Sequence, residues 1–427
     1  MKIHFIWAAW EKLYRLNYNI PPMGILRVAG MTPPDIDAVF TDEMVAPVDR
    51  NSDADIIAIS FLTPAAPHAY QLADHFRANG KYVVLGGTHT TLMPEEAGKH
   101  ADTVVIGEAE GIWEDFISDF RSGRPHPSYR APHLPDLGNL ASVRRSLLPK
   151  RVYPYSNPVL YGIESMELSR GCTSNCAYCL VPSTQGPVFR NRPMEDVCRE
   201  FDAVSRTDGI LFFTDNNLLG NWSFTRPALE ALVPHRKDWI GLMAPEDAAR
   251  DPVRLELLLE SGLCGIYGTV FAITGNEPPS VLENRKRNLR RLIEAGVVVI
   301  ATFALGWDDH DQTVFERTVA FCLEAGLTVP EFIINTPFPG SRLFRQYREQ
   351  NRLISTDWSL YNGNHAVFHP ARMSAGSLEE GYHACYDQFY RSVDRDKALF
   401  DGFRDRVLNA MIRARRKQKE TSRPPGH

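Results

Sequence analysis

Short apolar runs alternate with helix-like segments along most of this chain, and this alternation limits its fold more than any other feature. In the first 120 residues, runs rich in β-branched or aromatic residues predict strands, and segments with helical periodicity lie between them. Such alternation favours a parallel, doubly wound sheet, whose ligand lies beyond the carboxyl ends of the strands. The predicted strands and helices are Lys2–Trp7, Met23–Gly30, Ala38–Thr41, Ile56–Ser60, Ala65–Asn79, Tyr82–Leu85, Pro94–His100 and Thr103–Ile106.

A second alternation begins near residue 159. Repeated strand–helix units are typical of a partial TIM-type barrel, in which chemistry takes place at the carboxyl ends of the strands. The same pattern also suits an ordinary doubly wound domain. The predicted strands are Glu164–Ser169, Ile210–Thr214, Trp239–Met243, Gly265–Val270, Val297–Phe303 and Glu331–Asn335. The predicted helices between them are Met194–Ser205, Arg254–Ser261, Asn284–Ala295 and Thr313–Ala325.

The segment between these two regions differs in composition. Residues 121–158 are rich in proline and glycine, which interrupt both periodicities, and the segment is too long for an ordinary βα loop. We expect this linker to pack over the boundary between the two domains. The predicted α/β architecture is therefore a Rossmann-like domain (1–120), the linker (121–158), a barrel (159–345), and a C-terminal helical cap with a basic tail (346–427). The cap contains a predicted helix at Leu378–Tyr390.

Composition limits the function classes without selecting one. The chain has 427 residues, of which 44% are hydrophobic, enough to bury a sizeable core. A formal net charge of −5 gives no general signature of polyanion binding, so nucleic acid is not an expected partner. No run of ~18 apolar residues predicts a membrane span, and the amino terminus lacks the pattern of a signal peptide. These features favour a cytoplasmic protein.

Three cysteines, Cys172, Cys176 and Cys179, follow the first predicted strand of the second region. Three thiolates at this spacing can bind three irons of a [4Fe–4S] cube, and no nearby cysteine is placed to bind the fourth iron. An open coordination position separates a catalytic metal site from a closed structural one. The spacing therefore predicts a cluster with one iron free to bind a ligand.

Two other uses of these cysteines fit less well. A zinc knuckle needs a second pair of Cys or His ligands, but the next histidine is His235, far outside knuckle spacing. A disulfide framework is typical of small, cysteine-dense chains in an oxidising compartment. The other cysteines lie singly in apolar stretches and are predicted to be buried free thiols, namely Cys198, Cys264, Cys322 and Cys385.

The spacing of three and then two residues between the cysteines, with Tyr178 before the last one, resembles the radical S-adenosylmethionine (SAM) superfamily. The position of this motif after a first strand also favours the barrel over a doubly wound domain. The resemblance implies that the open iron of a [4Fe–4S] cluster binds the amino acid end of SAM. It also implies that an electron from the cluster breaks a C–S bond of SAM and forms a 5′-deoxyadenosyl radical.

Further SAM contacts are carried over from the resemblance. Asp215 and Asn216 follow the second barrel strand, where the superfamily commonly places a Gly-Gly-Glu-like segment that binds the SAM ammonium group. A carboxylate there suits a cation, although either residue could instead cap a helix N-terminus. At the fourth strand many relatives show Gly-x-Glu-Ser, whereas this chain reads Gly268-Thr-Val-Phe-Ala272. The acid is absent, and Thr269 is expected to replace part of its contact.

The first domain resembles the cobalamin-binding domain that often precedes a radical SAM domain. The resemblance is carried by Ser60-Phe-Leu62 after the third strand, by Gly86-Gly87 after the fourth, and by the segment Gly107–Gly111 after the fifth. Glycines allow a ligand to approach the backbone, and Ser60 offers a hydroxyl, although an isolated Gly-Gly pair is more often a tight turn. The resemblance implies a cobalamin base tail beside Ser60, Gly86 and Gly87, with Leu62 also at the site.

One element of the familiar cobalamin motif is missing. The second strand is normally followed by Asp-x-His-x-x-Gly, whose imidazole binds cobalt, but this chain reads Thr41-Asp-Glu-Met-Val-Ala-Pro47. We therefore expect cobalt to lack a histidine ligand from this motif. His68 and His89 are not assigned as substitutes, because single histidines near turns are more often hydrogen-bonded structural residues.

Together these features favour a cobalamin-dependent radical SAM enzyme. The resemblance implies a methyltransferase that moves a methyl group from methylcobalamin to an unactivated carbon of a natural-product, lipid or peptide substrate. It also implies an external electron donor of flavodoxin or ferredoxin type. One alternative keeps both cofactors but performs ring contraction or oxidative cyclisation, and another is a cobalamin or iron–sulfur sensor or electron carrier. No catalytic acid or base is identified from the sequence.

Overall fold

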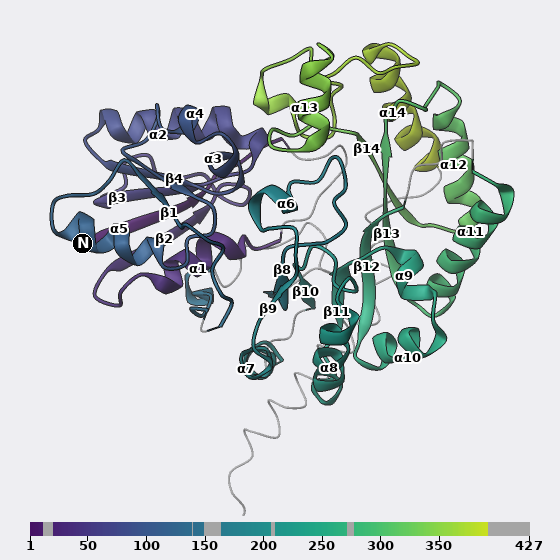
Figure 1. The fold of residues 1–427 in the computed structure, drawn as a ribbon, viewed down its shortest axis with the longest axis horizontal. Helices are drawn as coiled ribbons and strands as arrows, with labels where there is room; N and C mark the ends of the chain where they lie inside the picture. Colours follow the sequence, from purple (N-terminus) through teal and green to yellow (C-terminus); the bar gives the residue numbers. More distant parts are fainter. Residues whose placement is uncertain (12–19, 139, 149–163, 206–209, 271–276, 392–427) are drawn as a thin grey trace, which may run out of the picture.

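The computed structural model describes residues 1–11, 20–138, 140–148, 164–205, 210–270 and 277–391. Two α/β bodies lie side by side, with the N-terminal sheet at the left of Figure 1 and the second sheet at the right. None of the helices in these ranges has the length and apolar character needed to cross a lipid bilayer.

The N-terminal sheet is parallel and has the strand order β2-β1-β3-β4-β5-β6. Helices cover both of its faces, with α1 and α5 on one and α2, α3 and α4 on the other (Figure 1). The doubly wound arrangement predicted from the sequence is therefore confirmed. The elements are β1 (Lys2–Trp7), α1 (Met23–Met31), β2 (Asp37–Asp42), β3 (Ile56–Ser60), η1 (Thr63–Ala65), α2 (Ala66–Ala78), β4 (Tyr82–Gly86), α3 (Thr88–Leu92), α4 (Pro94–Ala97), β5 (Thr103–Ile106), α5 (Ile112–Arg121) and β6 (Ser128–Arg130).

Alternating strand residues divide the core of this domain into two layers. Ile57 and Ile59 of β3 pack with α2 on one face of the sheet. Phe5 of β1 packs with Trp113 of α5 on the other face. Residues two apart on a strand share a face, so a buried run such as Ile56–Ser60 contributes to both layers.

The segment predicted as a linker is partly structured. Strand β6 pairs with β5, and the side chain of Tyr129 is buried in the core of the N-terminal domain. Farther along, Ala141 accepts a hydrogen bond from Arg27 (2.7 Å), and η2 (Arg145–Leu147) begins with Arg145, which reaches Glu164 (3.1 Å). The described part of the segment thus contacts both bodies. The exact domain boundaries at 120, 158 and 345 stay a prediction.

The second sheet is also parallel and has the order β14-β13-β12-β11-β10-β7. Strands follow one another in chain order, and the helices lie on the outside, which confirms the partial barrel (Figure 1). The strands are β7 (Glu164–Met166), β10 (Leu211–Phe213), β11 (Trp239–Leu242), β12 (Leu263–Thr269), β13 (Val298–Leu305) and β14 (Val329–Ile334). The helices between them are α7 (Met194–Val204), α8 (Trp222–Leu232), α9 (Pro245–Ala249), α10 (Pro252–Glu260), α11 (Pro279–Glu294) and α12 (Val314–Ala325).

The first barrel strand is shorter than expected. The sequence predicts one strand over Glu164–Ser169, but β7 ends at Met166, and a separate strand β8 (Ser169–Arg170) pairs with β9 (Arg190–Asn191). A period-two pattern does not show where the chain leaves a sheet. Here β8 turns away to form an antiparallel pair at the root of the cysteine loop.

Helix α13 (Arg342–Glu349), η5 (Trp358–Leu360) and α14 (Ala375–Phe389) follow the barrel and confirm a helical C-terminal region. Tyr386 of α14 donates its hydroxyl to the carbonyl of Phe332 in β14 (3.0 Å), so this helix closes the last barrel strand. Three of the four isolated cysteines are buried as predicted, whereas Cys198 is half-buried. The basic cluster at 413–419 lies outside the described residues.

Candidate cofactor site at the domain junction

The cysteine loop begins at a glycine that no other residue could replace without moving the chain. Gly171 has a φ of +86°, and a Cβ built on it would lie 2.0 Å from the carbonyl oxygen of Val188. Two sulfur atoms then lie near backbone N–H groups, Cys172 Sγ near Ser174 N (3.5 Å) and Cys179 Sγ near Val181 N (3.4 Å). N–H groups directed at sulfur favour the thiolate form that iron binds.

The donor set suits an iron–sulfur cluster. Burial raises the pKa of the Cys179 thiol, the Val181 N–H acts in the opposite direction, and the neighbouring Cys176 and Cys172 raise the pKa further. The described ranges hold no group of three His, Cys, Asp or Glu side chains converging on a single metal ion. A cube needs no such convergence, because each thiolate binds a different iron. The three free thiols on one loop therefore fit the predicted cluster.

Asp215 supports the base of this loop. Its side chain is 1% exposed and accepts hydrogen bonds from Leu168 N (2.9 Å), Ser169 N (2.7 Å) and Ser169 Oγ (2.7 Å). Burial raises the pKa of Asp215 to about 6. Both carboxylate oxygens are thus directed at the β7–β8 connection, and in this arrangement Asp215 positions the loop rather than facing a SAM ammonium group. The alternative of a helix N-cap is wrong, because α8 begins only at Trp222.

Asn216 supports the cysteine loop through Gln185, a residue that no sequence motif indicates. Its Nδ2 donates to Gln185 Oε1 (2.6 Å), and the same oxygen accepts a longer hydrogen bond from Gly171 N (3.4 Å). Gln185 follows the short helix α6 (Val181–Thr184) directly after the cysteine loop. Its amide therefore joins the end of β10 to the start of that loop. No spacing in the sequence indicates this contact.

Tyr178 and Thr269 lie together on the barrel side of the cysteine loop. The Tyr178 ring meets Trp307 edge-on, with 5.8 Å between the ring centroids. Burial raises the pKa of Tyr178, the Cys176 thiol raises it further, and a hydrogen bond with Thr269 acts in the opposite direction. Thr269 ends β12 and pairs in register with Thr302 of β13. Two residues predicted to bind cofactor are thus brought next to the cluster ligands.

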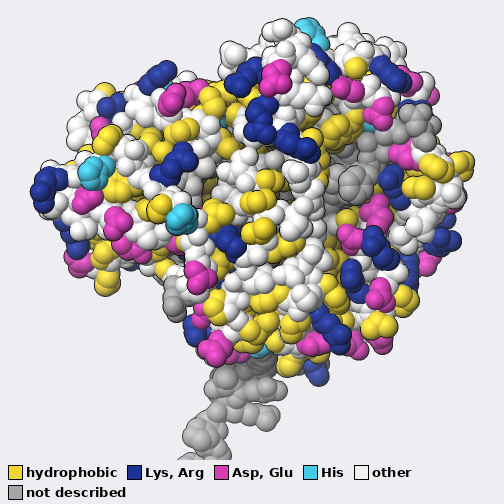
Figure 2. All heavy atoms as spheres, in the orientation of Figure 1, with side chains coloured by type: hydrophobic (Ala, Val, Ile, Leu, Met, Phe, Trp, Pro, Cys, Tyr) yellow, Lys and Arg dark blue, Asp and Glu magenta, His cyan; other side chains and the backbone are white. Residues whose placement is uncertain are grey.

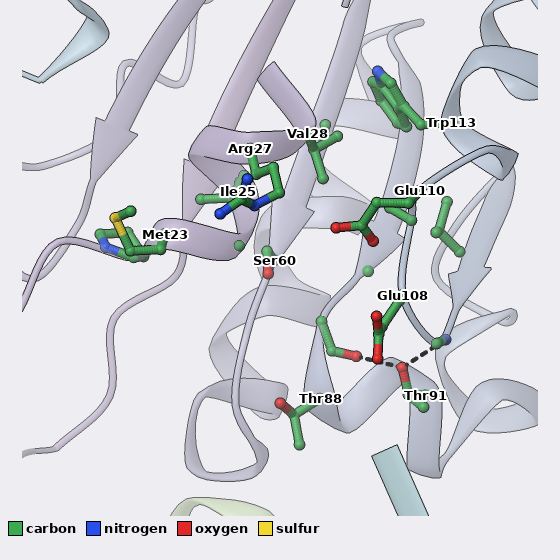
Figure 3. Close-up of a pocket in the computed structure, with 18 of the residues that line it drawn as sticks. Met23, Ile25, Arg27, Val28, Ser60, Thr88, Thr91, Glu108, Glu110 and Trp113 are labelled. Atoms are coloured by element: carbon green, nitrogen blue, oxygen red, sulfur yellow. Dashed lines mark hydrogen bonds between the residues drawn. The ribbon is translucent and has the colours of Figure 1, made fainter. Parts of the chain in front are cut away.

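A cavity of about 400 Å³ lies at the carboxyl ends of the N-terminal strands, between the two bodies. Figure 3 shows the labelled side chains around it, with α1 residues on one side and Glu108 and Glu110 on the other. Ser60, Gly86 and Gly87 line it, as the sequence predicts. Its apolar lining includes Phe5, Ile25, Val28, Val84, Val105 and Trp113. A space lined by apolar side chains and closed by a few polar groups is typical of a small-molecule or cofactor site.

Gly87 allows the ends of β3 and β4 to approach each other. Its φ is +94°, and a Cβ there would lie 2.7 Å from Ser60 Oγ and 2.8 Å from Phe61 N. Thr91 Oγ1 donates to the carbonyl of Gly87 (2.9 Å) and accepts from Gly107 N (2.9 Å). Three strand-end loops are thereby linked. Leu62 does not line the cavity, because the chain turns there into η1.

The opposite wall of the cavity comes from the barrel side of the molecule. Thr184 and Gln185, which follow the cysteine loop, line the same space as the glycines of β4. Thr214, the residue after β10, lines it as well. The predicted cobalamin cavity therefore opens directly onto the elements that hold the predicted cluster.

Arg170 binds three carboxylates at this junction. Its Nη1 donates to Glu108 (2.6 Å), its Nη2 donates to Glu110 (2.8 Å), and its Nε and Nη2 donate to Glu167 (3.2 and 2.9 Å). The four side chains are each at most 16% exposed. Glu108 and Glu110 belong to the loop after β5, whereas Arg170 directly precedes Gly171. One guanidinium group thus joins the cobalamin-side loop to the start of the cysteine loop.

The electrostatics of this cluster are strongly coupled. Burial by itself lowers the pKa of Arg170, but Glu167 and Glu110 outweigh burial and hold that pKa above its ordinary value. Burial acts to raise the pKa of Glu167, yet Arg170 and Arg27 bring it below the ordinary range. Arg27 of α1 donates to Glu167 (2.9 Å), so the helix that walls the cavity is tied to the same carboxylate.

No motif or spacing in the sequence indicates that these charged residues meet. The segment Gly107–Gly111 resembles part of a cobalamin-binding domain, and its two glutamates are partners of Arg170. Arg27 and Glu167 are far apart in the sequence, and nothing in their spacing indicates that they meet. Such pairs become visible only when the two sheets are placed against each other.

Comparison with known proteins agrees with this arrangement. The B12 binding domain family matches residues 15–117, and the Radical SAM superfamily matches residues 166–322. Bacteriochlorophyllide d C-12(1)-methyltransferase of Chlorobaculum tepidum is 26% identical over 406 residues, which cover 91% of this chain and 86% of the relative. Bacteriochlorophyllide d C-8(2)-methyltransferase of the same organism is 27% identical over 374 residues, with coverages of 81% and 79%.

A solved structure shares the fold along most of the chain. The radical SAM methyltransferase TsrM from Kitasatospora setae, determined with cobalamin and a [4Fe–4S] cluster bound, superposes with a TM-score of 0.65 and 14% sequence identity. The match covers 92% of this chain and 89% of TsrM. With a B12-binding domain followed by a radical SAM barrel, the chain belongs to the cobalamin-dependent radical SAM enzymes, whose cofactors are cobalamin, SAM and a [4Fe–4S] cluster.

Proposed function

We propose that the protein is a methyltransferase that adds a methyl group to an unactivated carbon of a small molecule. The observation that carries this proposal is the shared cavity. Ser60, Gly86 and Gly87 line it from the B12-binding domain, and Thr184 and Gln185 line it from the segment after the cysteine loop. A methyl donor and a radical source must act on one substrate without intervening solvent, and a common space between two cofactor sites meets that need.

Residues of this chain hold, orient and enclose the reacting groups. When bound, cobalamin supplies a transferable methyl group, and SAM on the cluster supplies the radical that removes a substrate hydrogen. Cys172, Cys176 and Cys179 would bind the cluster, and Asp215 and Gln185 fix the start of their loop through the contacts described above. Precise placement of reacting groups accounts for a large part of catalysis in such enzymes, because the cofactors perform the bond chemistry.

No histidine of the first domain is among the described residues that line the cavity. His68 is paired with Glu43 (2.9 Å), and His89 is buried with its Nδ1 3.2 Å from Thr63 Oγ1. Asp42, in the position of the missing motif, accepts a hydrogen bond from Met44 N (2.9 Å) and so closes its own turn. These contacts support cobalamin binding in which no histidine of that motif reaches cobalt.

The sequence relatives guide the choice of substrate. Two of them are named for methylation of bacteriochlorophyllide d, so tetrapyrroles are the first class to test. Lipids, antibiotic precursors and peptides follow in the same assay. The remaining parts of the proposal are an electron donor of flavodoxin or ferredoxin type, a cytoplasmic location and the absence of a nucleic acid partner.

Anaerobic reconstitution with iron, sulfide and cobalamin, followed by addition of SAM labelled in its methyl group, tests the function. We expect 5′-deoxyadenosine and a substrate that carries the label, both measured by mass spectrometry. A Cys176→Ala variant should form neither product, because one cluster ligand is lost. Deoxyadenosine with an altered but unlabelled product would instead indicate ring contraction or cyclisation. Binding of all cofactors without SAM cleavage would indicate a sensor or electron carrier.

A further inference from the structure

Arginines on α13 form a basic surface beside the cysteine loop. Arg342, Arg345 and Arg348 recur every third residue on this helix, and all three side chains are exposed. Residues three apart are neighbours on a helix surface, so these guanidinium groups form one patch, which we call the α13 patch. Figure 2 shows Lys and Arg side chains gathered over α13. The chain as a whole is acidic, with a net charge of −5, so this patch is a local exception.

The α13 patch is attached to the loop that carries the cluster ligands. Arg342 Nη2 donates to the carbonyl of Asn175 (2.8 Å), and Leu343 N donates to the carbonyl of Ala177 (2.9 Å). Both carbonyls lie between cysteines of the motif. Residues 173–175 of this loop are exposed to solvent. The cluster site therefore reaches the protein surface next to the α13 patch, and no other described element has to move to expose it.

Ion pairing does not account for Arg345 and Arg348, although the Arg348 guanidinium lies 5.8 Å from the centroid of the Phe344 ring. Within the described ranges, neither Arg345 nor Arg348 forms an ion pair, and exposed Glu349 on the same helix does not pair with them. Arg352, by contrast, is bound by Asp308 (2.6 Å). Neighbouring like charges on a helix are destabilising, so charges left uncompensated in this way favour a role in binding an anionic partner.

We propose that the α13 patch docks the acidic face of a small electron-transfer protein of flavodoxin or ferredoxin type. This inference rests on the proposed function, because each radical formed from SAM requires one electron. The reduced flavin or iron–sulfur group of the donor is oxidised by one electron, and the cluster held by the three cysteines gains it. No atom or proton has to cross the interface in this step.

The size and charge of the patch suit such a partner. Electron-transfer complexes are transient and bury less than ~1,200 Å², so the exposed side of one helix together with its neighbouring loop is a sufficient surface. Opposite charges steer the two proteins together and raise the rate of encounter, an effect that salt screens. The nearby exposed loop, residues 173–175, then connects the surface directly to the cluster ligands on either side of it.

The test compares two matched charge reversals. Arg345→Glu with Arg348→Glu changes the α13 patch, and Arg342 is left unchanged because it holds the cysteine loop. Arg287→Glu with Arg290→Glu is the control, since these exposed arginines have the same spacing on α11, on the outer side of the barrel. Arg287 donates to Asn284 Oδ1 (2.7 Å) and Arg290 to the Glu324 carbonyl (2.6 Å), so the control also includes the loss of local hydrogen bonds. The dissociation constant for oxidised flavodoxin and for oxidised ferredoxin is measured at low and high salt. The rate of 5′-deoxyadenosine formation is then measured with each reduced protein and, separately, with dithionite.

We expect at least one donor to bind the wild-type and control proteins with similar, salt-sensitive affinity. The patch variant should bind that donor at least ~10-fold more weakly and with little salt dependence. SAM cleavage driven by the donor protein should fall by a similar factor below saturation, while cleavage driven by dithionite should not change. This separation shows that the variant keeps its fold and its cluster.

Three results would overturn the docking proposal. One is equal donor affinity in the patch variant and the wild type, and another is a wild type that binds neither donor. The third is a patch that binds anionic lipid vesicles or DNA in place of the donors. Failure of the proposed function has a different signature, because wild-type protein would then not cleave SAM even with dithionite, whereas the binding measurements would still decide the docking question.

Discussion

Replacing Arg170 by methionine removes the cation that three junction carboxylates share but keeps an unbranched side chain in its place. Glu108, Glu110 and Glu167 would remain in a site where their side chains are at most 16% exposed. Removing one partner of a buried ion pair costs ~3–5 kcal/mol, because the remaining charge is left desolvated. Arg27 still contacts Glu167 and Arg190 still pairs with Glu108, so we expect the lower end of this range, ~3 kcal/mol in the free energy of unfolding.

The penalty should depend on pH in a defined direction. In the wild type, burial raises the pKa of Glu167, but Arg170 and Arg27 outweigh it and hold the pKa below its ordinary value. The contribution of Glu167 to stability is therefore present above its ordinary pKa and is lost as pH falls. Without Arg170, burial dominates and raises the pKa, so the contribution is lost as pH rises. The variant should consequently be least stable relative to wild type at neutral to alkaline pH and should recover on acidification.

Urea unfolding of both proteins under anaerobic conditions, at about pH 8 and about pH 5, measures this effect. An Arg226→Met variant is the control, because it removes only an exposed pair with Glu230 (2.9 Å) and should cost at most ~0.5 kcal/mol. Combining Arg170→Met with Glu167→Gln should restore part of the loss, since the unpaired charge is removed as well. A loss below ~1 kcal/mol at the higher pH, or an equal loss at both pH values, would refute the reasoning.

Three further perturbations test single parts of the site. Gly171→Ala should abolish cluster assembly, measured by iron content, because its Cβ would lie 2.0 Å from Val188 O; normal iron content would contradict this. Asp215→Asn should lower the iron content of the protein. It should also remove the pH dependence that Asp215 gives to stability. Burial raises the pKa of Asp215 to about 6, so its contribution to the free energy of unfolding is complete below its ordinary pKa and is lost as pH rises through about 6. Urea midpoints of the two proteins should therefore converge as pH rises from about 4 to about 7, and parallel profiles would argue against this. Gly87→Ala should weaken cobalamin binding ~10-fold or more by pushing Ser60 aside, measured by visible absorbance after desalting, and unchanged retention would show that the strand ends tolerate a Cβ.

Much of the fold follows from local pattern. Strands such as Lys2–Trp7 and Ile56–Ser60 have the predicted bounds, because a buried parallel strand is a continuous apolar run between breaks. Two N-terminal helices, Thr88–Leu92 and Ile112–Arg121, were not predicted. The first is too short to show a period. The second carries apolar residues at helical spacing but lies next to the proline-rich segment that was assigned to the linker.

The candidate site was predictable where its chemistry is local. Cys172, Cys176 and Cys179 lie on one short loop, and Gly86 and Gly87 lie at the end of one strand. The residues of each group are therefore neighbours both in the sequence and in space. Asp215 was placed in the correct region but given a different role, because the sequence does not show that β7 stops at Met166 and leaves N–H groups for a carboxylate. Contacts such as that between Arg27 and Glu167 depend on how two sheets meet, which local pattern does not specify.

Neither of the two bodies forms the cavity alone, because each supplies part of its lining. Helix α1 and the loop after β5 form one side of it, and Thr184 and Gln185 form the other. The volume and the lining of this space therefore depend on how the two bodies are held against each other. The ion pairs of Arg170 with Glu108, Glu110 and Glu167 join the two bodies and line the same space, so a change in any of these charges alters the wall that a bound cofactor would meet.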